Sequence, residues 1–164
     1  MRFEDFTATR LPALLRYATL LSGDRDEGHD IVQDVLTRAL VRWSRIGAIE
    51  EPYAYVRTMI TNHFLSLRRR RRLWTVPLRD SDDHVQPPDP EPGDSGTLWQ
   101  MLAALPRQQR AVLVLRYYEG LSDDEIAEVL GCRPGTVRGY ASRALATLRI
   151  ELRTDAKTNE GALP

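Results

Sequence analysis

The sequence of 164 residues has only one cysteine, Cys132. It also has little lysine, because Lys157 is the one lysine among 23 Lys and Arg residues. A single cysteine excludes an internal disulfide. The histidines His29, His63 and His84 are not at metal-ligand spacing, so we expect no metal and no other cofactor. No apolar run approaches the roughly 18 residues of a membrane helix. The N-terminus, MRFEDF, lacks the basic-then-apolar order of a signal peptide. We therefore expect a cytoplasmic protein without membrane insertion.

A net charge is also missing, because 23 Lys and Arg balance 23 Asp and Glu. The charges are nevertheless distributed unevenly. Residues 1–75 hold 13 arginines against nine acidic residues, a net charge of +4, and residues 97–153 hold eight against six, a net charge of +2. Residues 76–96 hold one arginine and six acidic residues, a net charge of −5. Two basic segments around an acidic one favour an anionic partner such as nucleic acid.

Three helices are predicted in residues 1–75. The first spans about 3–21 and is broken by Pro12 near its start. The second spans 26–43 and places its apolar residues on one face, namely Ile31, Val32, Val35, Leu36, Ala39, Leu40 and Trp43. The third begins at Glu51-Pro52 and runs to about Arg72, with an inward stripe of Tyr53, Val56, Ile60, Phe64 and Leu67.

Two groups of polar residues in this segment could contact either water or a binding partner. The arc opposite the second stripe holds Asp30, Gln33, Asp34, Thr37 and Arg38, and by itself such an arc is typical of solvated surface. The third helix ends in five arginines that circle its axis, which are Arg68, Arg69, Arg70, Arg71 and Arg72. A helix C-terminus favours positive charge. Five adjacent like charges repel one another, however, so contact with a nucleic-acid backbone is the better explanation.

Residues 76–96 contain Pro87, Pro88, Pro90 and Pro92 and few apolar residues, which predicts an extended or disordered linker. From Thr97 the helical pattern returns, first to Leu105 and then from Pro106 towards Gly120. Residues 154–164 show no core-forming pattern and are expected to form a disordered tail. The predicted fold is all-α, with two small helical domains, 1–75 and 97–153, joined by a flexible, acidic, proline-rich linker.

Residues 121–149 read as two helices joined by a tight turn. Ser122 with Glu125 has the pattern of a capping box, Gly131 can end the first helix, and Pro134 can begin the second. The second helix buries a stripe of Val137, Ala141, Ala144 and Leu148, and it presents Gly135, Arg138, Gly139, Ser142 and Arg143 on its other side. Such a helix fits a major groove, where arginine can bind guanine. This predicts a helix-turn-helix, although a helical hairpin with solvated arginines is the alternative.

Taken together, these segments resemble an extracytoplasmic-function sigma factor, a member of group 4 of the sigma-70 superfamily, of actinobacterial type. GHDIVQDVLTRALVRW is similar to the family's core-binding segment, and LPRQQRAVLVLRYYEGLSDDEIAEVLGCRPGTVRGYASRALATLR is similar to its fourth domain. The resemblance covers nearly the whole chain. It implies sigma domain 2, sigma domain 4 and a connector that runs through the polymerase cleft.

The resemblance also implies partners for the polar residues of residues 1–75. Asp30, Gln33 and Asp34 would bind the clamp helices of the largest RNA polymerase subunit, which reverses the solvated reading. Pro52 to Arg72 would melt and read the downstream promoter element, with Asn62 near the captured base. Arg57, His63 and the arginine run would hold the strand backbone. Tyr53, Tyr55 and Trp74 could stack on bases, although a core position is the simpler reading of Tyr53.

In the fourth domain, the resemblance implies that Arg138 and Arg143 contact the upstream promoter element, with Thr136 near a phosphate. Gly139 and Ser142 complete this face. Here the sequence departs from the family pattern, because Gly139-Tyr140 stands where Ser-Arg is common and Arg133 takes the place of a capping serine. One cationic contact is lost, and Arg133 can supply another from the turn.

The sequence therefore predicts a non-enzymatic sigma factor with RNA polymerase core, including the flap, and promoter DNA as partners. A separate anti-sigma factor is the default regulator. A stand-alone helix-turn-helix regulator is the alternative, but it leaves residues 1–75 without a task. A hydrolytic or metal enzyme would have to use clusters such as Asp123-Asp124-Glu125. Their place at a helix start explains these acids, and no nucleophile or phosphate loop accompanies them.

Overall fold

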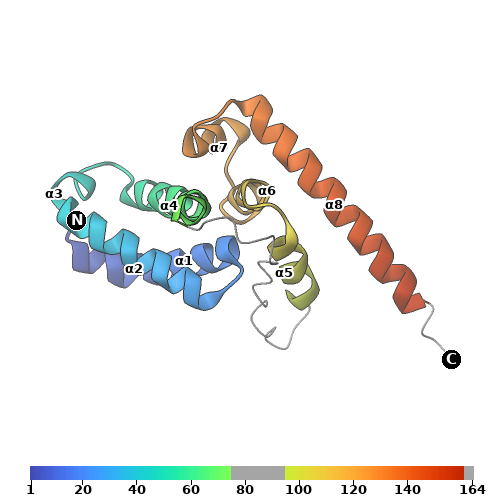
Figure 1. Ribbon diagram of the computed structural model, residues 1–164. Coiled ribbons are helices and arrows are strands. Elements are labelled where there is room, and N and C mark those ends of the chain that lie inside the picture. The colour runs from blue at the N-terminus through green and yellow to red at the C-terminus, as the bar shows by residue number, and fades with distance from the viewer. Residues whose placement is uncertain (75–94, 161–164) are drawn as a thin grey trace. The chain divides into compact units, whose positions relative to one another are not determined.

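The computed structural model describes the backbone of residues 1–74 and 95–160, and the side chains of residues 1–66 and 98–150. Every regular element in these ranges is helical, in agreement with the predicted all-α class. The chain divides into two compact units, Met1–Asp89 and Pro90–Pro164 (Figure 1). The expected linker, residues 76–96, lies outside the described residues except for Ser95 and Gly96, which begin α5.

The N-terminal unit consists of α1 (Phe3–Ser22), α2 (Arg25–Val41), the short α3 (Trp43–Ile46) and α4 (Pro52–Trp74). Helices α1, α2 and α4 pack against one another (Figure 1). Their shared core is formed by Phe6, Leu14, Tyr17, Leu21, Ile31, Val32, Val35, Val56, Ile60 and Phe64. These are mostly the residues that helical spacing had placed inward, because one apolar stripe on each helix must be buried against the others.

Local capping sets the α1–α2 turn. Gly23 ends α1 in the left-handed conformation, with φ of 75°, and the Asp24 carboxylate then accepts hydrogen bonds from the backbone of Asp26 and Glu27 at 2.7 and 3.3 Å. The two helices approach closely where Gly28 faces Thr19, since a Cβ on Gly28 would lie 2.8 Å from the Thr19 hydroxyl oxygen.

Two sequence expectations for this unit were wrong in detail. Helix α1 continues through Pro12, because Pro12 is exposed and the packing of buried Phe6 and Leu14 holds the helix on both sides of it. Leu40, expected in the core, is 52% exposed. Helix α2 ends at Val41, and Trp43 begins α3, where its ring packs against Phe3 and Phe6.

The C-terminal unit consists of α5 (Ser95–Ala104), α6 (Arg107–Leu113), the π-helix η1 (Val114–Tyr118), α7 (Asp123–Leu130) and α8 (Pro134–Glu160). Helix α8 packs against α5, α6 and α7. The buried side chains are Met101, Leu105, Ala111, Val112, Leu113, Val114, Leu115, Ile126, Ala127, Val137, Ala141, Ala144 and Leu148. They include the whole stripe predicted for the second helix of the helix-turn-helix.

Two features of this unit differ from the expectation, namely the end of the helix after Pro106 and the tail, and nothing in the sequence predicted a third, the burial of Arg110. The helix that starts after Pro106 changes to π geometry before Gly120, which leaves the Tyr117 and Tyr118 side chains exposed. Arg110 is buried and donates to the carbonyl oxygens of Ala103 and Leu105 at 2.8 and 2.9 Å. It therefore satisfies backbone groups at the end of α5. Helix α8 continues to Glu160, so the expected disordered tail from residue 154 is corrected for residues 154–160.

Candidate functional site

A polar face of α2 stands out from the N-terminal unit. Asp30, Gln33 and Asp34 are all exposed, while the neighbouring Ile31, Val32 and Val35 are buried. The face is thus arranged as the 3.6-residue repeat predicts. Its acidic and amide groups can accept hydrogen bonds from a cationic partner.

Asp34 is also part of a three-residue cluster that joins α2 to α4. The Arg38 guanidinium lies 3.7 Å from the Asp34 carboxylate, and the His63 Nε2 lies 3.5 Å from it. Arg38 also donates to His63 Nδ1 at 2.7 Å. Because arginine can only donate, Nδ1 must accept, and the ring proton then sits on Nε2 and faces Asp34. The predicted core-binding face and the predicted promoter-binding helix therefore share a polar contact.

The structure gives two of the predicted strand-binding residues a packing position. The His63 side chain is only 9% exposed and its ring nitrogens face α2. Arg57 is 9% exposed and its guanidinium lies 5.7 Å from the centre of the Tyr53 ring, which also faces Arg10 at 5.2 Å. Neither side chain stands open to a DNA backbone in this conformation. Tyr53 is partly buried, as the core reading expected.

Two other predicted DNA-contacting residues of α4 are exposed, in contrast to Arg57 and His63. Asn62 is exposed on the helix, and Tyr55 is 45% exposed. The backbone of Arg68, Arg69, Arg70, Arg71, Arg72 and Trp74 belongs to α4, but their side chains lie outside the described ranges.

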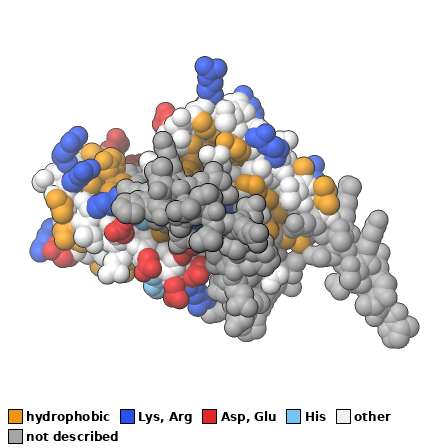
Figure 2. Space-filling model, viewed as in Figure 1, with side chains coloured by type: hydrophobic (Ala, Val, Ile, Leu, Met, Phe, Trp, Pro, Cys, Tyr) orange, Lys and Arg blue, Asp and Glu red, His pale blue; other side chains and the backbone are white. Residues whose placement is uncertain are grey.

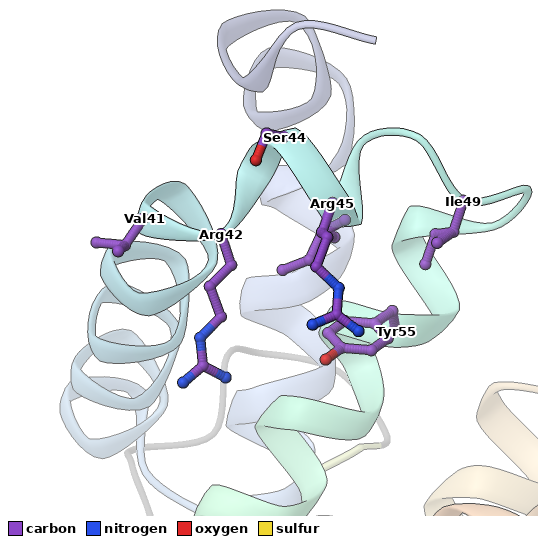
Figure 3. Close-up of a pocket in the computed structure, with 7 residues that line it drawn as sticks. Val41, Arg42, Ser44, Arg45, Ile49 and Tyr55 are labelled. Carbon is purple, nitrogen blue, oxygen red and sulfur yellow. The ribbon is translucent and has the colours of Figure 1, made fainter.

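Sequence reasoning missed a pocket at the junction of α2, α3 and α4. It is lined by Val41, Arg42, Ser44, Arg45, Ile46, Ile49 and Tyr55 and has a volume of about 380 Å³. In Figure 3 the Arg42 and Arg45 side chains extend in the same direction, and Arg45 ends beside the Tyr55 ring in that view. Apolar and cationic side chains lie side by side over this region in Figure 2. Two of its apolar lining residues, Val41 and Ile49, are exposed, and no sequence pattern marked them as part of a pocket.

The helix-turn-helix of the C-terminal unit forms as predicted. The Ser122 hydroxyl accepts from the Glu125 backbone at 3.2 Å, Gly131 ends α7 with φ of 66°, and Pro134 begins α8. Around α8, Val137, Ala141, Ala144 and Leu148 are buried. The predicted DNA-facing set is exposed apart from the partly exposed Gly139, and it consists of Arg133, Thr136, Arg138, Gly139, Ser142 and Arg143. Cationic side chains stand out along the first half of α8 (Figure 2).

The two central arginines of this face are held by different neighbours. Arg138 lies 3.9 Å from the Asp123 carboxylate at the start of α7. Asp123 also pairs with Arg116, and that bond raises the pKa of the Arg116 guanidinium against the opposing effect of burial. Arg143 instead lies over the Tyr140 ring, 5.3 Å from its centre. The N–H groups of an exposed arginine side chain can donate paired hydrogen bonds to guanine.

The described residues contain no group of three or more His, Cys, Asp or Glu arranged to hold a metal ion. Cys132 lies partly exposed in the turn of the helix-turn-helix. Among the described helices, none is both long and apolar enough to cross a membrane. The exposed residues of the α2 face and of the α8 face carry charged and hydrogen-bonding side chains.

Both units match known protein families. Residues 7–73 match the model of Sigma-70 region 2, and residues 95–148 match that of Sigma-70, region 4. A chain with both regions has the defining parts of a sigma factor. This chain belongs to the sigma-70 family and, within it, to the extracytoplasmic-function RNA polymerase sigma factors.

Its relatives include actinobacterial sigma factors. The chain is 37% identical over 153 residues to the RNA polymerase sigma-E factor of Streptomyces avermitilis, covering 93% of this chain and 86% of the relative. It is 32% identical over 146 residues to ECF RNA polymerase sigma factor SigL of Mycobacterium tuberculosis, covering 85% and 82%. The sigma factor RpoE of Bartonella quintana, solved in complex with the anti-sigma factor NepR, has a TM-score of 0.70 at 26% identity and covers 93% of this chain and 98% of that chain.

Proposed function

We propose that this sigma factor binds RNA polymerase core through α2, opens and reads a downstream promoter element with α4 and the adjoining pocket, and reads an upstream element with α8. The observation that carries the proposal is that one chain presents both the exposed face of Asp30, Gln33 and Asp34 and the exposed arginine face of α8. It acts in the cytoplasm and has no catalytic activity of its own.

Core binding is assigned to the α2 face because its acceptors are exposed and project from a helix fixed by buried Ile31, Val32 and Val35. A carboxylate on a rigid helix can pair with a polymerase arginine without a large ordering cost. We propose the clamp helices of the largest subunit as the partner of this face and the flap as the partner of the C-terminal unit.

Downstream recognition is assigned to the α2–α3–α4 pocket together with Asn62. The pocket volume of about 380 Å³ lies within the roughly 300–1,000 Å³ typical of pockets for small ligands. It offers the Tyr55 ring for stacking and two arginines for phosphate contacts. An extruded base needs such stacking and pairing partners, since it gives up its neighbours in the duplex. We propose that the Arg68 to Arg72 run holds the backbone of the same strand.

A regulator of this protein is expected to be a separate anti-sigma factor. The structural neighbour from Bartonella quintana was solved with such a partner. An anti-sigma factor that occupied the α2 face or the arginine face of α8 would block polymerase or promoter binding.

Run-off transcription tests the proposed function. Purified polymerase core is given promoter-bearing genomic fragments with and without the full chain, and discrete new start sites are expected only when the chain is present. The variant Asp34→Arg serves as the matched negative control. If core stays silent while the chain alone protects duplex DNA from cleavage, the stand-alone regulator replaces the sigma role. The family match of residues 7–73 disfavours that alternative.

A further inference from the structure

Tyr140 on α8 is held in place from outside its own helix. Its side chain is partly buried, and its hydroxyl donates to the Gln108 side-chain oxygen of α6 at 2.5 Å. The residues are 32 positions apart in sequence, so the bond exists only because α6 packs against α8. The bond fixes the direction of the Tyr140 ring and engages its hydroxyl.

The Arg143 guanidinium lies over that ring. Its central carbon is 5.3 Å from the ring centre, within the distance at which a cation is attracted to an aromatic face. Gly139, one turn earlier, leaves the space beside it open, since a Cβ there would only reach ordinary contact with Arg143 Nη2 at 3.7 Å. A guanidinium held over an aromatic ring can keep the N–H groups at its edge available to donate.

This differs from the way Arg138 is held. Arg138 faces the Asp123 carboxylate at 3.9 Å, so part of its donor edge points towards an acceptor within the protein. Within the part of the chain that the structure describes, Arg143 makes no ion pair with a carboxylate, in contrast to Arg138. An arginine side chain otherwise loses about 2 kcal/mol of rotamer entropy when it is ordered on a ligand, and a ring that restricts it in advance reduces that loss.

We propose that Tyr140 is a positioning residue for Arg143: the contacts from Gln108 to Tyr140 to Arg143 aim the guanidinium at one guanine of the upstream element. This inference rests on the proposed function of α8. The ligand group is a guanine that offers O6 and N7 in the major groove, where a planar guanidinium can donate to both. Tyr140 sets sequence preference without reading a base itself.

The test measures promoter preference base pair by base pair. The full chain and polymerase core transcribe a promoter library in which each upstream base pair is varied, using the wild type, Arg143→Ala, Tyr140→Leu, Tyr140→Phe and the double variant. Arg143→Ala is expected to flatten the preference at one base pair. Tyr140→Leu is expected to reduce the preference at that same base pair by about twofold to fivefold, the loss that corresponds to an exposed cation–aromatic contact. Preferences at the other base pairs should stay unchanged.

Two comparisons separate positioning from packing. Tyr140→Phe keeps the ring and loses only the bond to Gln108, so it should reduce the preference at the same base pair, but by less than Tyr140→Leu does. In the Arg143→Ala background, Tyr140→Leu should cause no further loss of preference, because the residue it positions is already absent.

Other outcomes overturn the inference. If Tyr140→Leu changes the preference at a different base pair, Tyr140 itself reads DNA. If it lowers transcription equally from all library members, its role is packing. If the wild type starts no transcription from any promoter, both the proposed function and this inference are wrong. If Tyr140→Leu leaves the base-pair preferences unchanged while the wild type transcribes, only this inference is wrong.

Discussion

The replacement Asp34→Arg separates binding from folding at the α2 face. Asp34 is 60% exposed and pairs with Arg38, which is 48% exposed. Removing an exposed ion pair costs about 0–1 kcal/mol, and the new repulsion from Arg38 one turn away adds about 0.2–0.5 kcal/mol. Asp34 also faces the largely buried His63 Nε2 at 3.5 Å, and the loss of that acceptor costs about 1–3 kcal/mol. The free energy of unfolding should therefore fall by no more than about 4.5 kcal/mol, which is less than the roughly 5–15 kcal/mol of a typical domain, so the variant stays folded.

Core binding should respond far more strongly. Reversing a charge that is buried against a polymerase cation costs about 2–5 kcal/mol, or from about 30-fold to several thousandfold in affinity. Urea denaturation of the free protein and fluorescence anisotropy with labelled protein and core measure the two quantities separately.

The matched control is Asp5→Arg, which makes the same charge change at an exposed position of α1. Asp5→Arg should bind core with the affinity of the wild type. A folded Asp34→Arg protein with undiminished core affinity would refute the assignment of this face. An equal loss in both variants would show that overall charge is responsible instead of the α2 face.

Further variants test the other contacts. Arg138→Ala should cost about 1–3 kcal/mol in binding to the upstream element if the arginine reads a base. Competition with altered DNA sequences shows whether this loss depends on one base pair. An equal loss on every sequence would mean that Arg138 contacts a phosphate instead. Tyr55→Ala should lower promoter opening by about 1–3 kcal/mol per stacked base, measured by permanganate reactivity of unpaired thymines, and wild-type opening would exclude the pocket. Arg110→Ala should lower the free energy of unfolding by about 2–4 kcal/mol, because two carbonyl groups at the end of α5 lose charged donors; a urea-measured loss under about 1 kcal/mol would contradict this.

Helical faces were predictable because they depend on local spacing. The exposure of Asp30, Gln33 and Asp34 follows from the buried stripe of the same helix. The helix-turn-helix was predictable for a related reason, since Ser122, Gly131 and Pro134 each act within a few residues of their own position. The roles of these faces in binding stay predictions until the assays above are done.

Contacts between distant segments were not predictable in the same way. The family resemblance implied that His63 contacts the DNA strand. In the structure its ring meets Arg38, 25 residues away in sequence, because α4 packs across α2. The pocket beside Tyr55 exists because α2 ends at Val41 and α3 turns the chain. No local pattern encodes either arrangement.

Local sequence patterns predicted most of the helices and their boundaries, most of the buried stripes and the two-unit organisation. These follow from hydrophobic periodicity and capping, which act over one or two turns of a helix. The packing of helices against one another buries Arg57 and Arg110, brings Tyr140 to Gln108 and brings Asp34 to His63. These polar contacts depend on how the helices cross. A buried polar group must form a hydrogen bond, and the crossing of the helices determines which partner lies within reach.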